Sequence, residues 1–93
     1  MSLRIERSSI TDGTRIRLSG EVRSDRLAEV RAEIARSEPP VTVDLEELDH
    51  VDAEAIRFLN ACEALGVELA NCSSFIREWM LQEREREKNP EGA

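Results

Sequence analysis

The stretch Val41 to Leu45, "VTVDL", constrains the fold of this chain more than any other segment. Pro39 and Pro40 stand directly before it and end any preceding helix, because proline has no amide hydrogen to donate. The stretch itself is short and rich in β-branched residues, and residues with helical spacing follow it closely. A strand of this kind is typical of the centre of a parallel sheet, so we expect an α/β fold.

Two further regions have the residue pattern of β-strands. Apolar and polar residues alternate on both sides of "TDGT", residues 11–14, which predicts a hairpin joined through a glycine turn. The stretch "VELAN", Val67 to Asn71, is expected to form another strand. With Val41 to Leu45 these regions give a sheet of four strands.

Apolar residues at helical spacing predict three helices. The first has Ser24 or Asp25 as its N-cap, the second runs from the cap Asp52 to Gly66, and the third follows a serine cap at residues 73–74. The residues expected to face the core from these helices are Leu27, Val30, Ile34, Ala55, Phe58, Leu59, Cys62, Leu65, Phe75, Ile76, Trp79 and Met80.

A chain of 93 residues fits a single domain with one core, which we expect at residues 1–82. After it, the segment "QEREREKNPEGA" combines favourable ion pairs at i,i+3 with like charges at i,i+4, and the two roughly cancel. Residues 83–93 are therefore predicted to continue the third helix into solvent and to end in a disordered tail.

The charge and composition disfavour several classes of partner. Thirteen basic and twenty acidic residues give a formal charge of −7, which argues against binding to nucleic acid or to an anionic membrane. No apolar run approaches the roughly 20 residues that span a bilayer, and the N-terminus lacks the apolar core of a signal peptide. We therefore expect a cytoplasmic protein without membrane insertion.

The acidic residues around His50 raise the question of a metal or catalytic site. Asp49, His50 and Asp52 could supply metal ligands, but the first two are neighbours in a loop and Asp52 is the expected helix cap. No aromatic residue nearby would desolvate an acid and raise its pKa for acid–base catalysis. Cys62 and Cys72 are interpreted as small apolar residues instead of a disulfide or a zinc site. We expect no enzymatic activity and no cofactor, and a metal-dependent enzyme is the least favoured alternative.

Three stretches together resemble a STAS domain, the module of anti-sigma factor antagonists and of sulphate-transporter tails. They are "IRLSGEV" (residues 16–22), "VTVDLEELDHVDAEAIRFL" (41–59) and "LGVELANCSSFIREWM" (65–80), and the resemblance covers roughly residues 15–81. It implies an α/β fold in which a four-stranded mixed sheet carries three α-helices mainly on one face. Relative to many members of the family, the domain would be truncated at the C-terminus.

One position departs from the family's pattern. The serine that is phosphorylated in the family aligns with Ala53, and no Ser, Thr or Tyr occurs between Thr42 and Cys72. Phosphorylation at this helix start would add negative charge to the docking surface and so release the partner. This chain cannot use that switch at that place, and the neighbouring Glu54 is a poor substitute for a phosphoserine.

The resemblance implies a regulatory protein–protein interaction domain similar to an anti-sigma factor antagonist. Its partner would be a kinase-like anti-sigma factor or, alternatively, the ATPase of a lipid-transport assembly; a second copy of the chain is a further partner. Docking is expected through the loop at residues 48–51 and the outer face of the second helix. The predicted docking residues are Leu48, Asp49, His50, Asp52, Ala53, Glu54, Arg57 and Asn60. Asp44 is expected to fix the loop after its strand by accepting backbone N–H groups.

Overall fold

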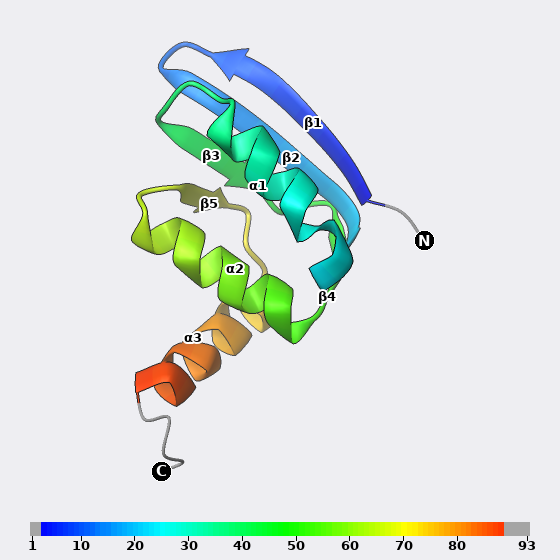
Figure 1. The fold of residues 1–93 in the computed structure, drawn as a ribbon, viewed down its shortest axis with the longest axis vertical. Helices are drawn as coiled ribbons and strands as arrows, with labels where there is room; N and C mark the ends of the chain where they lie inside the picture. The colour runs from blue at the N-terminus through cyan, green and yellow to red at the C-terminus, as the bar shows by residue number, and fades with distance from the viewer. Residues whose placement is uncertain (1–2, 89–93) are drawn as a thin grey trace.

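The computed structural model describes residues 3–88 and shows a sheet with helices packed against it (Figure 1). Its elements in chain order are β1 (Leu3–Ile10), β2 (Gly13–Val22), the 3₁₀ helix η1 (Ser24–Arg26), α1 (Leu27–Ala35), β3 (Val41–Asp44), β4 (Leu48–Val51), α2 (Ala53–Ala64), β5 (Glu68–Ala70) and α3 (Ser74–Lys88). The described residues thus form a mixed α/β fold with a five-stranded sheet and three α-helices. The predicted α/β class is confirmed, whereas the predicted number of four strands is wrong.

The long strand β2 organises the sheet. β1 pairs with it antiparallel, as the hairpin pattern predicted, and β3 pairs parallel with its first half, from Thr14↔Val41 to Arg17↔Asp44. β5 continues the sheet parallel to β3. β4 pairs parallel with the last residues of β2. Because β1 already occupies the other side of β2, β3 and β4 follow one another along the same side.

The additional strand β4 occupies residues 48–51, where a docking loop was expected. Leu48 and His50 pair with consecutive residues of β2, so Asp49 is an extra residue and forms a β-bulge. The bulge allows Leu48 and Val51 both to pack against the core, although they are three positions apart. Residues on one face of a regular strand are two apart, so the bulge hid this strand in the sequence pattern.

The core lies between one face of the sheet and the helices. α1 and α2 lie across this face, and α3 packs against α2 (Figure 1). The largest fully buried apolar side chains are Ile16, Leu18, Val22, Val30, Val43, Ile56 and Met80. Alternate residues of β2, including Arg15 and Arg17, project from the opposite face, which the described helices leave open.

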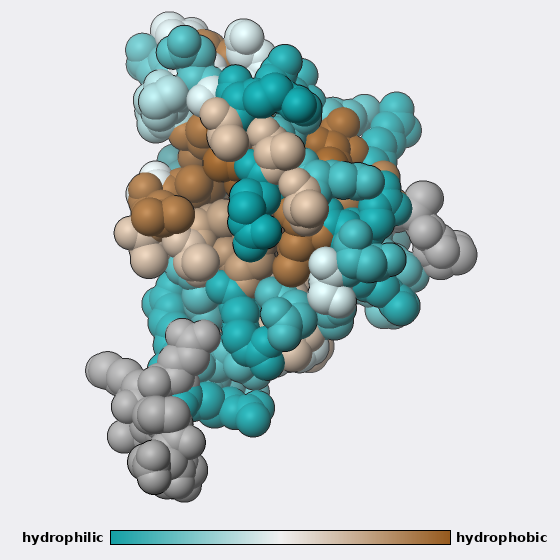
Figure 2. Space-filling model, in the orientation of Figure 1, coloured by the Kyte–Doolittle hydropathy of each residue, from teal (hydrophilic) through white to brown (hydrophobic). Residues whose placement is uncertain are grey.

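Most of the predicted core positions on the helices are buried, but the predictions for Leu65 and Phe75 are wrong. Leu65 follows the end of α2 and is 85% exposed, because the chain already turns away from the core there. Figure 2 shows hydrophobic residues at the surface over α1 and α2. Arg31 lies over the ring of Phe58, with its Cζ atom 5.2 Å from the ring centroid, and shields that ring from water.

Two of the three predicted helix caps are confirmed. The Asp52 carboxylate accepts the N–H group of Ala55 at 2.9 Å, and the Ser73 hydroxyl oxygen accepts that of Ile76 at 3.2 Å. The predicted cap at residues 24–25 is wrong, because these residues form η1 and no side-chain hydrogen bond caps α1.

The charged segment after residue 82 continues α3 to Lys88, as predicted. Its first residues pack against α2 instead of only continuing into solvent, however. Glu83 is buried, and Arg84 Nε donates to the Asn60 side chain of α2 at 2.8 Å. The packed domain therefore extends at least two residues beyond the predicted boundary. The predicted disorder of residues 89–93 falls outside the described residues, and none of the described helices is long and apolar enough to cross a membrane.

Gly13 and Gly66 form a matched pair for testing the turn geometry. Both have a positive φ, +133° and +98°, which L side chains rarely adopt. A Cβ atom on Gly13 would collide with the carbonyl oxygen of Pro40, whereas one on Gly66 would meet open space. We expect Gly66→Ala to lower the free energy of unfolding by about 1 kcal/mol and Gly13→Ala by clearly more, as measured by urea denaturation. Equal losses in the two variants would contradict the close approach of the hairpin to Pro40.

Candidate functional site

Seven of the eight predicted docking residues lie at the end of the sheet where β2 and β4 finish and α2 begins. In open α/β sheets, this carboxyl end of the strands is the usual place for binding sites. The turn after β2 and the turn after β4 are neighbours there, because the two strands pair through Val22↔Val51. We call residues 21–26 and 48–57 together the carboxyl edge.

Asp52 joins the two halves of the carboxyl edge. Its Oδ1 atom accepts the N–H of Ala55 and so caps α2, while its Oδ2 atom accepts the N–H of Ser24 at 2.9 Å. Its negative charge also lies at the helix start, where the helix dipole favours it. One carboxylate therefore fixes the turn after β2 against the start of α2.

The remaining predicted positions surround this anchor. Asp49, His50 and Glu54 are exposed, while Leu48 and Ala53 are half-buried. His50 pairs with a residue on the open face of the sheet and Leu48 packs on the core, because the bulge at Asp49 re-aims the strand between them. These predicted positions therefore present two acids and one imidazole to solvent on a fixed backbone.

The expectation that Asn60 is an exposed docking residue is wrong. Asn60 is buried, its Nδ2 atom donates to the Met80 carbonyl at 3.0 Å, and its Oδ1 atom accepts from Arg84. The helical spacing from Glu54 to Asn60 indicated one outer face, but α3 covers the C-terminal part of that face. Asn60 therefore attaches α3 to α2.

Arg57 is divided between the surface and this helix contact. It pairs with Glu54 at 2.8 Å and lies 3.5 Å from Glu83, whose side chain is only 6% exposed. A charge reversal at Arg57 would set two carboxylates against each other beside a buried acid. Loss of binding in such a variant could not be distinguished from loss of stability.

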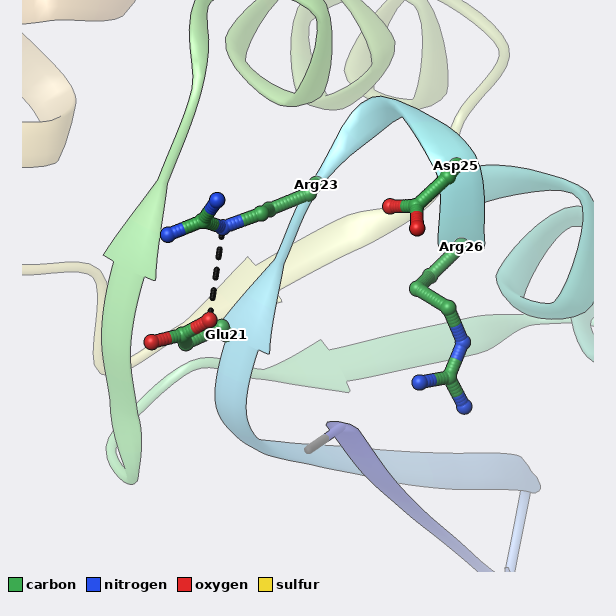
Figure 3. Close-up of a pocket in the computed structure, with 4 residues that line it drawn as sticks. All are labelled: Glu21, Arg23, Asp25 and Arg26. Carbon is green, nitrogen blue, oxygen red and sulfur yellow. Dashed lines mark ion pairs between the residues drawn. The ribbon is translucent and has the colours of Figure 1, made fainter. Parts of the chain in front are cut away.

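A polar hollow of about 240 Å³ opens in the carboxyl edge, lined by Glu21, Arg23, Asp25 and Arg26 (Figure 3). Arg23 Nε pairs with Glu21 at 3.3 Å, and Arg26 pairs with Glu29 of α1 at 2.8 Å. No sequence pattern indicated these residues, because alternating acids and bases are typical of any solvated surface. Two positive and two negative groups around one hollow suit a charged or polar side chain of a partner.

Asp44 is a second structural carboxylate, at the end of β3. It is fully buried, and its Oδ2 atom accepts from Arg15 at 2.9 Å and from Arg17 at 3.2 Å. Its Oδ1 atom accepts the N–H of Glu46 and the Nδ2 of Asn71, both at 3.0 Å. The bond from Glu46 is the loop contact that the sequence led us to expect. The three side-chain donors extend this role to two other parts of the sheet.

These contacts determine the charge state of Asp44. Burial on its own raises the pKa of this carboxyl, but the hydrogen bonds from Asn71, Glu46, Arg15 and Arg17 outweigh it and hold the pKa well below its ordinary value. The hydrogen bond and the charge of Asp44 in turn raise the pKa of Arg17. Asp44 is therefore an ionised structural group.

The groups that could carry chemistry are dispersed or already engaged. Among residues 3–88 no group of three His, Cys, Asp or Glu side chains is placed to hold a metal ion. Asp52 already accepts two backbone N–H groups, which removes it from the metal site considered with Asp49 and His50. Burial raises the pKa of Cys62 to about 11, so its thiol stays protonated near neutral pH.

Comparisons with known proteins assign no family to this chain. A scan against models of protein families found no match, and a search of curated proteins found no significant match.

Replacement of Asp44 by asparagine should change how stability depends on pH. Because the pKa is lowered in the folded state, the contribution of Asp44 is complete above its unfolded pKa of about 3.9 and is lost as the pH falls towards the folded value. We expect Asp44→Asn to cost about 2–3 kcal/mol at pH 7 and progressively less below pH 4, measured by urea denaturation. Asp49→Asn, which replaces an exposed carboxylate of the carboxyl edge, is the control. A cost for Asp44→Asn that stays constant down to pH 2 would contradict the assignment.

Proposed function

We propose that this chain is a non-enzymatic regulatory domain that binds a protein partner through the carboxyl edge, as an anti-sigma factor antagonist of STAS-like fold would. The observation that carries the proposal is the double role of Asp52. By bonding both Ser24 and Ala55, it holds the edge rigid and leaves the neighbouring exposed side chains available for a partner. A preformed surface loses little conformational entropy on binding.

The charges of the edge support a protein partner with a complementary surface. Asp49 and Glu54 are exposed acids, and the chain as a whole carries a formal charge of −7. The hollow at residues 21–26 adds fixed groups of both signs. Complementary charges of this kind speed association and fix orientation.

The proposed partner binding is not controlled by phosphorylation at the start of α2. Ala53 is the first residue of α2, is half-buried and has no hydroxyl group. Partner binding at this edge would therefore be independent of a phosphoryl group at that position.

An aromatic pair on α3, in which Phe75 is exposed and Trp79 is half-buried, favours a second candidate function, as a subunit of a lipid-transport assembly that contains an ATPase. Phe75 is 69% exposed, and its ring meets that of Trp79 edge-on with centroids 5.9 Å apart. The two rings line a hollow of about 460 Å³ together with Glu78 and Gln82. Aromatic residues are enriched at protein interfaces, so this surface would suit a persistent subunit contact.

Capture of the partner from the source cell, with wild-type chain and charge-reversed variants, tests the proposal. Asp49→Lys and Glu54→Lys alter the carboxyl edge, and Asp12→Lys is a matched control in the β1–β2 turn at the other end of β2. We expect wild type and control to retain a kinase-like anti-sigma factor, and the edge variants to bind about tenfold more weakly or worse.

The same capture separates the two candidates. Retention of a transporter ATPase that is lost with Phe75→Ser and kept with the edge variants would support the transport subunit. Equal retention by wild type, both edge variants and the control would contradict docking at the carboxyl edge.

A further inference from the structure

The free edge of β1 is a second place where another chain can bind. β1 is the terminal strand of the order β1-β2-β3-β5, so one row of its backbone groups pairs with no strand among the described residues. The strand is eight residues long and contains no proline, and its charged residues Arg4, Glu6 and Arg7 are of both signs, so they can pair with those of an incoming strand instead of only repelling it. At the other end of the sheet, β5 has only three residues. The β1 edge is therefore the longer template for strand addition.

We propose that a second copy of this chain occupies this edge, with the two β1 strands antiparallel about a twofold axis at Ile5. The two sheets would then continue into one another. This inference uses residues of β1 alone and does not depend on the proposed function.

The charges of β1 select this register. Consider a twofold axis that is perpendicular to the sheet and lies midway between one residue and its copy, so that this residue is at the axis. That residue then faces its own copy, and the residue before it in each strand faces the residue after it in the other strand. With Ile5 on the axis, Arg4 of each copy faces Glu6 of the other, which makes two pairs of opposite charge. With Glu6 or Arg7 on the axis, like charges would face each other. Opposite charges stabilise a cross-strand pair and like charges destabilise it.

The side chains involved are available for these contacts. Arg4 and Glu6 pair within the strand at 3.2 Å, but their side chains are 75% and 47% exposed. They project from the open face of the sheet, so the helices do not cover them. Ile5 is only partly buried at the margin of the core and would gain burial against its copy. Arg7 is held by Glu33 of its own α1 at 3.2 Å, so its charge stays paired.

Sedimentation equilibrium of the purified chain over a wide concentration range tests the proposal. We expect a reversible monomer–dimer equilibrium that weakens as salt screens the ion pairs. Arg4→Glu and Glu6→Arg should each raise the dimer dissociation constant about tenfold, and the double variant R4E/E6R should restore it, because opposite charges again face each other. Circular dichroism should show all three variants folded. A wild-type chain that stays monomeric into the high micromolar range, or a double variant that stays weak, would overturn the proposal.

Cross-linking tests the register separately, with Cys72 replaced by serine to remove the half-buried thiol. Ile5→Cys should give an intermolecular disulfide under mild oxidation, because position 5 faces its own copy. Ser8→Cys lies on the same strand and is more exposed, yet the proposed axis keeps its two copies far apart. Stronger cross-linking through Ser8→Cys than through Ile5→Cys would place the axis elsewhere and overturn the register.

Discussion

The buried carboxylate of Asp44 is the interaction on which the arrangement of this sheet depends. On one side, β2 pairs first with β3 and then with β4. The chain must therefore leave the sheet after β3 and rejoin it four residues later as β4. Asp44 stands at this exit and binds donors from β2, from the loop that leads to β4, and from Asn71 after β5. A buried charge is costly unless such donors satisfy it. The complete set of partners makes this exit, and hence the path into β4, a fixed feature.

This constraint leads directly to the candidate site. The path fixed by Asp44 brings β4 alongside β2, and the bulge at Asp49 then re-aims the strand before Asp52 starts α2. Asp44 and Asp52 are both engaged in holding the backbone, whereas Asp49, His50 and Glu54 are left exposed. The cluster of acids in this part of the chain therefore separates into structural carboxylates and a small set of groups that can meet a partner.

The features that the sequence predicted well are those that depend on near neighbours. The hairpin around Gly13, the cap at Asp52 and the helix end at Gly66 each require only local backbone chemistry. The errors arise where distant segments meet: Asn60 is buried only because α3 lies over it, and β4 was missed because a bulge breaks the alternation of its apolar residues. The polar hollow at residues 21–26 is lined by one segment, from the end of β2 through η1, but its mixed charges look like those of any solvated surface in the sequence.

The most direct test of this account is the ionisation of Asp44 itself, followed by the carbon chemical shift of its carboxyl group in an NMR titration. We expect Asp44 to remain ionised well below the ordinary aspartate pKa of about 3.9 and to take up a proton only as the domain loses its fold in acid. Titration of Asp44 near pH 4 in a domain that stays folded would contradict this expectation. In that case neither the exit from β3 nor the carboxyl edge that follows from it could depend on this carboxylate.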